Sequence, residues 1–298
     1  MIMSVSMSKE KAKIGSLRAK DIIITAIIVI ICVVSILPLY VLIVNSTRAG
    51  QDITSNGVSL IPGLNLFKNI GTLQDWTSTG KVEYNALTGY VNSGIIALST
   101  TFLTVLFSGM TAYGIVVYDF KLKNAAYTFI LAVMMIPVQV TSVGFYQFMA
   151  KIGLTDSYIP LILPAIAAPA IVFFMRQSMK STFPLEIVEA ARIDGCGEYR
   201  TFFTIAIPMM KPAFAVQAIF AFVSNWNNYY MPSMILISRN KSQMTLPMMV
   251  NTILSNDKLA DFGAKYAAIM LSIVPVVIVY LIFSKFIVEG VALGGVKE

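Results

Sequence analysis

Histidine is absent from this 298-residue sequence, and cysteine occurs only twice. Without histidine, imidazole ligation of zinc or haem and a Ser/His or Cys/His nucleophilic pair are excluded. Cys32 lies in a long apolar run and Cys196 in a polar segment, so no disulfide framework is expected. The phosphate-binding pattern Gly-x4-Gly-Lys-Ser/Thr is also missing. We therefore expect no catalytic site, metal site or cofactor in this chain, and no ATP hydrolysis by it alone.

Charge is scarce as well. Charged residues make up 12% of the chain and hydrophobic residues 57%, with a mean hydropathy of +0.76, whereas soluble domains carry about 25% charged residues. A helix of about 20 apolar residues spans a bilayer. The sequence therefore predicts an all-α membrane protein with a single transmembrane domain over 22–298. Six transmembrane helices are predicted at about 22–44, 91–118, 125–149, 158–175, 213–237 and 264–287.

The distribution of lysine and arginine predicts the orientation. A basic tail precedes the first run at residues 1–21 and holds five of these residues. With this tail in the cytoplasm, the inner segments hold 14 of the 22 cations and the outer segments 8. This bias agrees with the positive-inside rule, so both termini and the segment 176–212 are expected in the cytoplasm. The net charge of +7 then needs no nucleic-acid partner.

Segment 176–212 is a polar island between two apolar runs. Pro184 suits the first turn of a helix, and Glu186 and Glu189 suit the positive N-terminal end of the helix dipole. Gly195 can adopt the left-handed backbone conformation that ends such a helix. Glu198 to Phe203 can form a second short helix before Pro208 and Pro212. From these residues alone, the segment is either a surface that another molecule reads or an ordinary connecting loop.

The island also carries a spaced pattern: Glu-Ala-Ala at 189–191, Gly195, Ile205, Ile207 and Pro208. This pattern resembles the signature loop of permease subunits of bacterial ATP-binding-cassette (ABC) importers. The resemblance implies that the loop docks in a cleft of a separate ATPase and passes its movement to the membrane helices. It implies a polar contact for Glu189, close approach for Ala190 and Ala191, and a turn at Gly195. The predicted coupling residues are Glu189, Ala190, Ala191, Arg192, Asp194, Gly195, Ile205 and Pro208.

Polar residues in the spans indicate a possible solute pathway. In the fifth span, Gln217, Asn225 and Asn228 share one helical face, with Trp226 and Tyr229 close by. Amides donate and accept hydrogen bonds, and an aromatic ring covers the apolar face of a sugar, so a neutral polyol suits them. The alternative is hydrogen bonding between helices. The predicted pathway residues are Gln139, Gln217, Asn225, Trp226, Asn228 and Tyr229.

Proline and small residues predict helix shape. Pro137 in the third span, and Pro160, Pro164 and Pro169 in the fourth, release backbone carbonyls, so both helices are expected to bend. In the second span, a series of small residues predicts a close-packing seam. These residues are Ser99, Thr100, Thr101, Thr104, Ser108, Gly109 and Ala112.

Three further stretches, 168–177, 224–232 and the glycine-rich 286–297, are similar to carbohydrate-uptake permeases, in particular the smaller membrane subunit of the maltose-type pair. This resemblance implies the type I importer fold in a bacterial inner membrane and half of a heterodimeric pore. It also implies a second permease subunit, two ATPase subunits that hold ATP and Mg, and an extracytoplasmic solute-binding protein that delivers an oligosaccharide or related sugar. An importer permease for another solute, such as an amino acid or phosphate, is the main alternative. An ion-coupled transporter is disfavoured because no ionisable pair lies within the spans, and a membrane enzyme because no acid/base or metal set converges.

Overall fold

The computed structural model describes residues 19–82, 84–238 and 242–295, with side chains described over 21–285 of these ranges. Throughout those ranges all regular elements are helical, which confirms the all-α class. Most of the predicted basic tail and the last three residues lie outside the described residues. The chain divides into two compact units, one of residues 1–72 with 260–270 and one of residues 73–259 with 271–298.

The first unit holds α2 (Ala19–Ser46), α3 (Gly50–Asn56) and the start of α4 (Leu66–Ser78). Asn69 is buried in this unit, and its Nδ2 donates to the carbonyls of Ser46 and Arg48 at 2.7 and 2.8 Å. These two bonds satisfy carbonyls at the end of α2 that have no helical partner. Along most of α2 the apolar side chains are exposed, as expected of a helix that lies in lipid or against another subunit.

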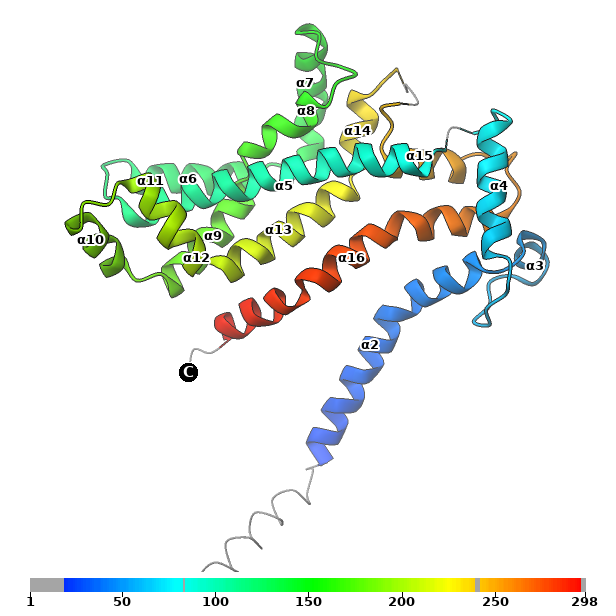
Figure 1. Cartoon of the computed structure of the whole chain (residues 1–298), viewed down its shortest axis with the longest axis horizontal. Helices are drawn as coiled ribbons and strands as arrows, with labels where there is room; N and C mark the ends of the chain where they lie inside the picture. Colours follow the sequence, from blue (N-terminus) through cyan, green and yellow to red (C-terminus); the bar gives the residue numbers. More distant parts are fainter. Residues whose placement is uncertain (1–18, 83, 239–241, 296–298) are drawn as a thin grey trace, which may run out of the picture. The chain divides into compact units, whose positions relative to one another are not determined.

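The second unit is built around α5 (Ala86–Val117). This helix packs against α9 (Pro169–Thr182), α13 (Lys211–Trp226), and the short helices α8 (Ile159–Ile162) and η1 (Leu163–Ile166) (Figure 1). Five of the seven residues of the predicted small-residue seam are buried, namely Thr100, Thr104, Ser108, Gly109 and Ala112, while Ser99 and Thr101 are half-buried. A Cβ built on Gly109 would lie 2.5 Å from Cζ of Phe214 on α13, so glycine permits this helix pair to approach.

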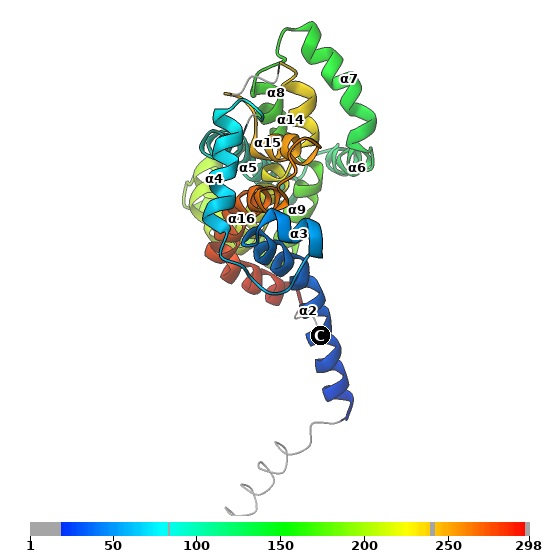
Figure 2. The same cartoon turned by 90° about the vertical axis from the view of Figure 1, so that its right-hand side faces the viewer.

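Two of the apolar segments are bent. The helix α6 (Lys123–Met134) meets α7 (Val138–Lys151) at 93°, with Pro137 at the break (Figure 2). A second bend of 83° separates the stretch Glu198–Met209 from α13. Together with the four longer apolar segments Asp21–Ser46, Ala86–Val117, Ile159–Thr182 and Phe262–Lys285, the bent pairs give six segments of spanning length and composition. In the fourth segment Pro164 and Pro169 interrupt the helix, as expected.

The fifth predicted span, 213–237, is not continuous. The helix α13 ends at Trp226, and the chain then forms α14 (Tyr230–Ile235). Asn228 therefore lies beyond the helix that carries Gln217 and Asn225, so the prediction that it continues their face is wrong. Its side-chain oxygen instead accepts from the Met231 amide at 3.2 Å. After α14 the chain forms α15 (Leu246–Leu254) and then α16 (Phe262–Gly295), which contains Pro275.

Candidate functional site: the Glu189–Pro208 loop

The predicted helix–turn–helix is present in the polar island. The helix α10 spans Leu185–Ile193 with Pro184 before its first residue, and α11 spans Glu198–Thr201. Gly195 adopts φ 75°, the left-handed conformation that glycine favours. Its amide donates to the Arg192 carbonyl at 3.0 Å, and the Cys196 amide donates to the Ala191 carbonyl at 2.8 Å. These two bonds form a Schellman motif, which ends the helix sharply.

A π-helical turn, η2 (Phe202–Ala206), connects α11 to α12 (Ile207–Met209). Within it, the Ile207 amide donates to the Phe202 carbonyl across five residues. Such turns are rare and usually occur singly within helices. The extra residue offsets the side chains, so Phe202 and Ala206 are both buried whereas Ile205 is only half-buried and Pro208 is exposed. The π-helical turn therefore places two buried side chains, Phe202 and Ala206, shortly before the 83° bend.

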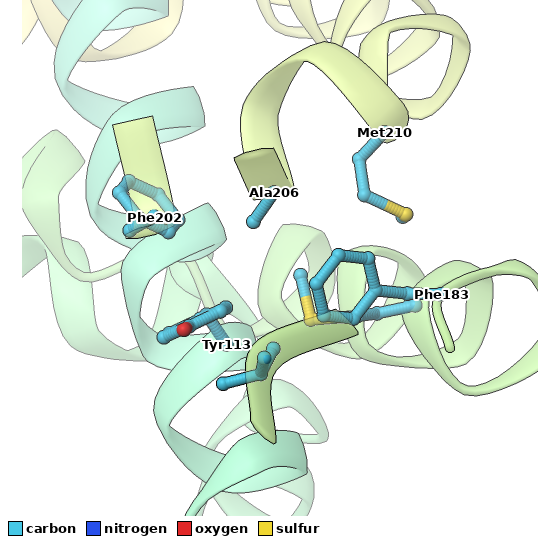
Figure 3. Packing of buried hydrophobic residues seen from close by; sticks show 7 residues of the cluster. Tyr113, Phe183, Phe202, Ala206 and Met210 are labelled. Atoms are coloured by element: carbon cyan, nitrogen blue, oxygen red, sulfur yellow. The ribbon is translucent and has the colours of Figure 1, made fainter. Parts of the chain in front are cut away.

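An apolar cluster fixes the island to the bundle. It includes Tyr113 of α5, whose ring lies edge-on to Phe202 at 5.3 Å and to Phe183 at 6.3 Å (Figure 3). In Figure 3, Ala206 and Met210 come from the η2 side and Phe183 from the end of α9. The other two members are Met179 and Val188. Because α5, α9, α10 and η2 all contribute, the loop is part of the folded core of this unit.

A polar contact lies beside this cluster. The Arg192 Nε donates to Glu198 Oε1 at 2.7 Å, and the Tyr118 hydroxyl donates to Glu198 Oε2 at 2.7 Å. The Arg192 guanidinium also lies 5.5 Å from the Tyr118 ring centroid. The hydrogen bonds from Arg192 and then Tyr118 lower the pKa of the Glu198 carboxyl. Because the Arg192 and Glu198 side chains are 38% and 40% exposed, solvent screens the ion pair and it adds little to stability. It therefore matters more for geometry than for stability.

The predicted coupling residues differ in exposure and in their contacts within this chain. Glu189, Ala190 and Asp194 are exposed, as contact with another protein requires. Ala191 is 8% exposed and packs inward, so its small side chain permits close packing inside this chain rather than approach by a partner. The side chain of Arg192 is held by Glu198. Each of these two residues thus contributes to the shape of the loop.

Two exposed residues were missed by sequence reasoning. Ile193 is 86% exposed and Tyr199 is 75% exposed, one before and one after the Gly195 turn. Large side chains of this kind in a polar segment are common anchors of protein interfaces. The signal in the sequence was a large apolar or aromatic side chain within a mainly polar segment, two residues before Gly195 and four residues after it.

The predicted pathway residues fall in separate places. Gln217 and Asn225 both line a cavity of about 610 Å³ between α5, α9 and α13. The Asn225 Nδ2 donates to the Ala221 carbonyl at 2.7 Å, which leaves its oxygen toward other partners. Thr104 and Ser224 add hydroxyls to an otherwise mainly apolar lining. Gln139 is exposed on α7 and lines none of the described cavities.

Trp226 and Tyr229 differ in availability. The indole of Trp226 is 4% exposed, stacks on Phe222 and Tyr90, and donates from Nε1 to the Ser272 carbonyl at 3.0 Å. Its donor is thus occupied, and its main role is packing. Tyr229 is 41% exposed and lines two further cavities, of about 560 and 280 Å³, each shared with Asn251 of α15. Asn251 was not identified from the sequence, because α15 lies outside every predicted span.

Comparison with known proteins supplies a family. Residues 104–292 match the model of the family described as "Binding-protein-dependent transport system inner membrane component". This chain belongs to that family. The matched region contains the Glu189–Pro208 loop and both residues of the 610 Å³ cavity that were predicted. The protein is accordingly a multi-pass membrane transport subunit.

Individual relatives match along almost the whole chain. The arabinooligosaccharides transport system permease protein of Halalkalibacterium halodurans is 35% identical over 271 residues, which are 90% of this chain and 93% of that protein. The Bacillus subtilis protein of the same name is 33% identical over 282 residues, 93% of this chain and 95% of that one. The lactose transport system permease protein of Rhizobium radiobacter is 30% identical over 280 residues, 94% of this chain and 97% of that protein.

A solved structure has the same fold. It is a bacterial ABC transporter involved in the import of the acidic polysaccharide alginate, with a TM-score of 0.73 and 20% sequence identity. The match covers 91% of this chain and 99% of that one. The type I importer fold predicted from the sequence is therefore confirmed.

Proposed function

We propose that this chain is one of two different membrane subunits of an ATP-driven importer for an oligosaccharide or related sugar. An extracytoplasmic binding protein delivers the sugar, and two ATPase subunits hold ATP and Mg on the cytoplasmic side. Family membership and the 30–35% identity to named sugar permeases over 90% or more of this chain support the proposal. The excess of Lys and Arg on one side supports cytoplasmic termini.

The exposed corner around the Gly195 turn is the observation that carries the proposal. Ile193 of α10 and Tyr199 of α11 are exposed at a corner that is otherwise polar. Val188 and Ala191 of α10 are buried. A partner that binds Ile193 and Tyr199 therefore moves a loop that is packed on the ends of α5 and α9. Closure of the ATPase pair would then rotate the membrane helices between inward and outward openings.

The 610 Å³ cavity fits the passage of a neutral sugar. Gln217 and Asn225 offer amide donors and acceptors, and Phe174 and Phe220 offer apolar rings in the same lining. Among the residues that line this cavity there is no Asp, Glu, Lys or Arg, so a strongly charged solute would lose its hydration without compensation. Such a lining binds a sugar weakly, which suits import because a solute that enters the path must also leave it.

Affinity purification of the tagged protein from its native membrane tests the proposal. We expect mass spectrometry to identify a second permease and an ATPase, and reconstituted vesicles to accumulate a labelled arabinooligosaccharide only with ATP and the binding protein. The variant Ile193→Glu with Tyr199→Glu should recover the second permease but little ATPase, because charge replaces the apolar anchors. Transport by the chain alone without ATP would contradict the proposal.

A phosphorylated polyol is the second candidate solute. The sn-glycerol-3-phosphate transport system permease protein of Pectobacterium atrosepticum is 30% identical over 92% of this chain. In addition, the lining of the 560 Å³ cavity includes Lys258, a cation for a phosphate, together with the carboxylate of Asp257. Uptake of labelled sn-glycerol-3-phosphate by the same vesicles, at the expense of the sugar, would favour this candidate.

A further inference from the structure

The contact between Tyr118, Glu198 and Arg192 joins two parts of the chain that are far apart in sequence. Tyr118 follows the last residue of α5, Arg192 belongs to the last turn of α10, and Glu198 begins α11. Both carboxylate oxygens of Glu198 are used, one by each partner, at 2.7 Å. A carboxylate bound at both oxygens has a fixed plane, so it defines the direction of α10 relative to α5.

The rings next to this contact extend it into the apolar cluster. The Tyr113 ring lies edge-on to Tyr118 at 6.2 Å and edge-on to Phe202 at 5.3 Å. Tyr113 lies just over one helical turn before Tyr118 and is 4% exposed. Within the described residues its hydroxyl has no hydrogen-bond partner, whereas that of Tyr118 does. The first tyrosine thus acts by packing and the second by its hydrogen bond.

We propose that Tyr118, Glu198 and Arg192 form a clasp that keeps the coupling loop and α5 in one orientation, so that ATPase movement passes directly to the second span. This inference rests on the proposed function. It assigns Tyr118 and Glu198 as positioning residues outside the Glu-Ala-Ala pattern, and it gives Arg192 a role within the chain. The loop is joined to α13 through the backbone. With the clasp in place, movement of the ATPase would reach α5 and α13 at the same time.

Distance measurement between two spin labels tests the clasp in the complete transporter complex. Cys32→Ser and Cys196→Ser remove the native thiols, and Thr111→Cys on α5 with Glu186→Cys on α10 place labels at exposed positions of the two helices. We expect one narrow distance distribution that stays the same after ATP and vanadate are added. In Tyr118→Phe and Glu198→Gln we expect a distribution at least twice as wide, which shifts on addition of ATP because the loop slips against α5.

Tyr113→Phe is the matched control, since it removes a tyrosine hydroxyl from the same helix where that hydroxyl has no partner. Its distribution should equal that of the parent. The double variant Tyr118→Phe with Glu198→Ala should give a distribution no wider than Glu198→Ala alone, because alanine already removes the carboxylate that accepts from Tyr118. Additive widening, or a narrow distribution in every variant, would overturn the clasp.

The two proposals fail differently in this design. If the purified complex contains no ATPase or hydrolyses no ATP, the proposed function fails, while the width without nucleotide still tests the clasp. If the complex hydrolyses ATP and the parent distance itself shifts with ATP, the loop and α5 do not move as one body and the further inference is wrong.

Discussion

Gly195 shows how a single residue sets the shape of the Glu189–Pro208 loop. Its φ of 75° ends α10 and reverses the chain, so that the exposed Ile193 and Tyr199 lie on either side of one turn. A residue with a Cβ is disfavoured in this conformation by about 1–2 kcal/mol. The glycine of the motif is therefore required by backbone geometry, independently of any contact with a partner.

Gly195→Ala should reduce ATP-driven transport strongly while the protein still reaches the membrane, because the strain reorients the corner. The measurement is solute uptake in vesicles together with the amount of protein in the membrane. Gly197→Ala is the control: Gly197 has φ −70°, and nothing lies within 4 Å of a Cβ built there. Equal loss of transport in both variants would contradict the role of the left-handed conformation.

Protonation of Glu198 should determine how the loop responds to low pH. Its pKa is lowered by Arg192 and Tyr118, so the pair stabilises the loop fully above the ordinary glutamate pKa of about 4.3 and is lost as pH falls through the lower folded value. The titratable groups that interact with Glu198 are Arg192, Tyr118 and Tyr113. The distribution of the Thr111–Glu186 label distance should therefore stay narrow at pH 5 and widen only below the ordinary glutamate pKa. Glu198→Gln should show no such transition.

At the scale of elements, α5 depends on small residues at its contacts. Gly109 permits Phe214 to pack against the helix, and Ser108 and Ala112 are fully buried beside it. Bulk at such a contact forces side chains away from their preferred positions. The price is a glycine inside a helix, which costs about 0.5–1 kcal/mol relative to alanine.

Gly109→Ala should destabilise the protein by about 1–3 kcal/mol, since the new Cβ overlaps the Phe214 ring. Gly114→Ala, five residues further along α5 and open within 4 Å, should be neutral or slightly stabilising. Thermal unfolding of the purified complex measures both. Phe214→Leu should recover part of the loss in Gly109→Ala, and absence of any recovery would place the strain elsewhere.

At the scale of the whole molecule, the described chain leaves many large apolar side chains exposed, along α2, α7 and α16 among others. A soluble monomer rarely exposes so much apolar surface. Lipid covers part of it, and we expect a second permease to cover part. The 610 Å³ cavity is lined mainly by α9 and α13, so we expect its final shape to depend also on what lies against these helices in the complete transporter.

Gln217→Ala and Asn225→Ala should each reduce sugar transport by about 10-fold or more without loss of the complex, because they remove amides from the cavity lining. Asn228→Ala serves as the comparison, since Asn228 lies off this cavity and contacts the Met231 amide. Uptake kinetics and recovery of the complex distinguish the outcomes. Unchanged kinetics in the first two variants would assign both amides to packing.

The sequence alone determined the class, the membrane segments in outline, and the helix–turn–helix of the Glu189–Pro208 loop, because these depend on local composition and on proline and glycine geometry. Tertiary contacts decided which residues of that motif are available. Tyr118 lies 80 residues from Glu198, and their hydrogen bond engages the carboxylate that also holds Arg192. Ala191 is buried, and α13 ends at Trp226 although the helical period continues to Asn228 in the sequence. Periodicity predicts which residues share a helix face only while the helix lasts, and burial depends on neighbours that are distant in the sequence.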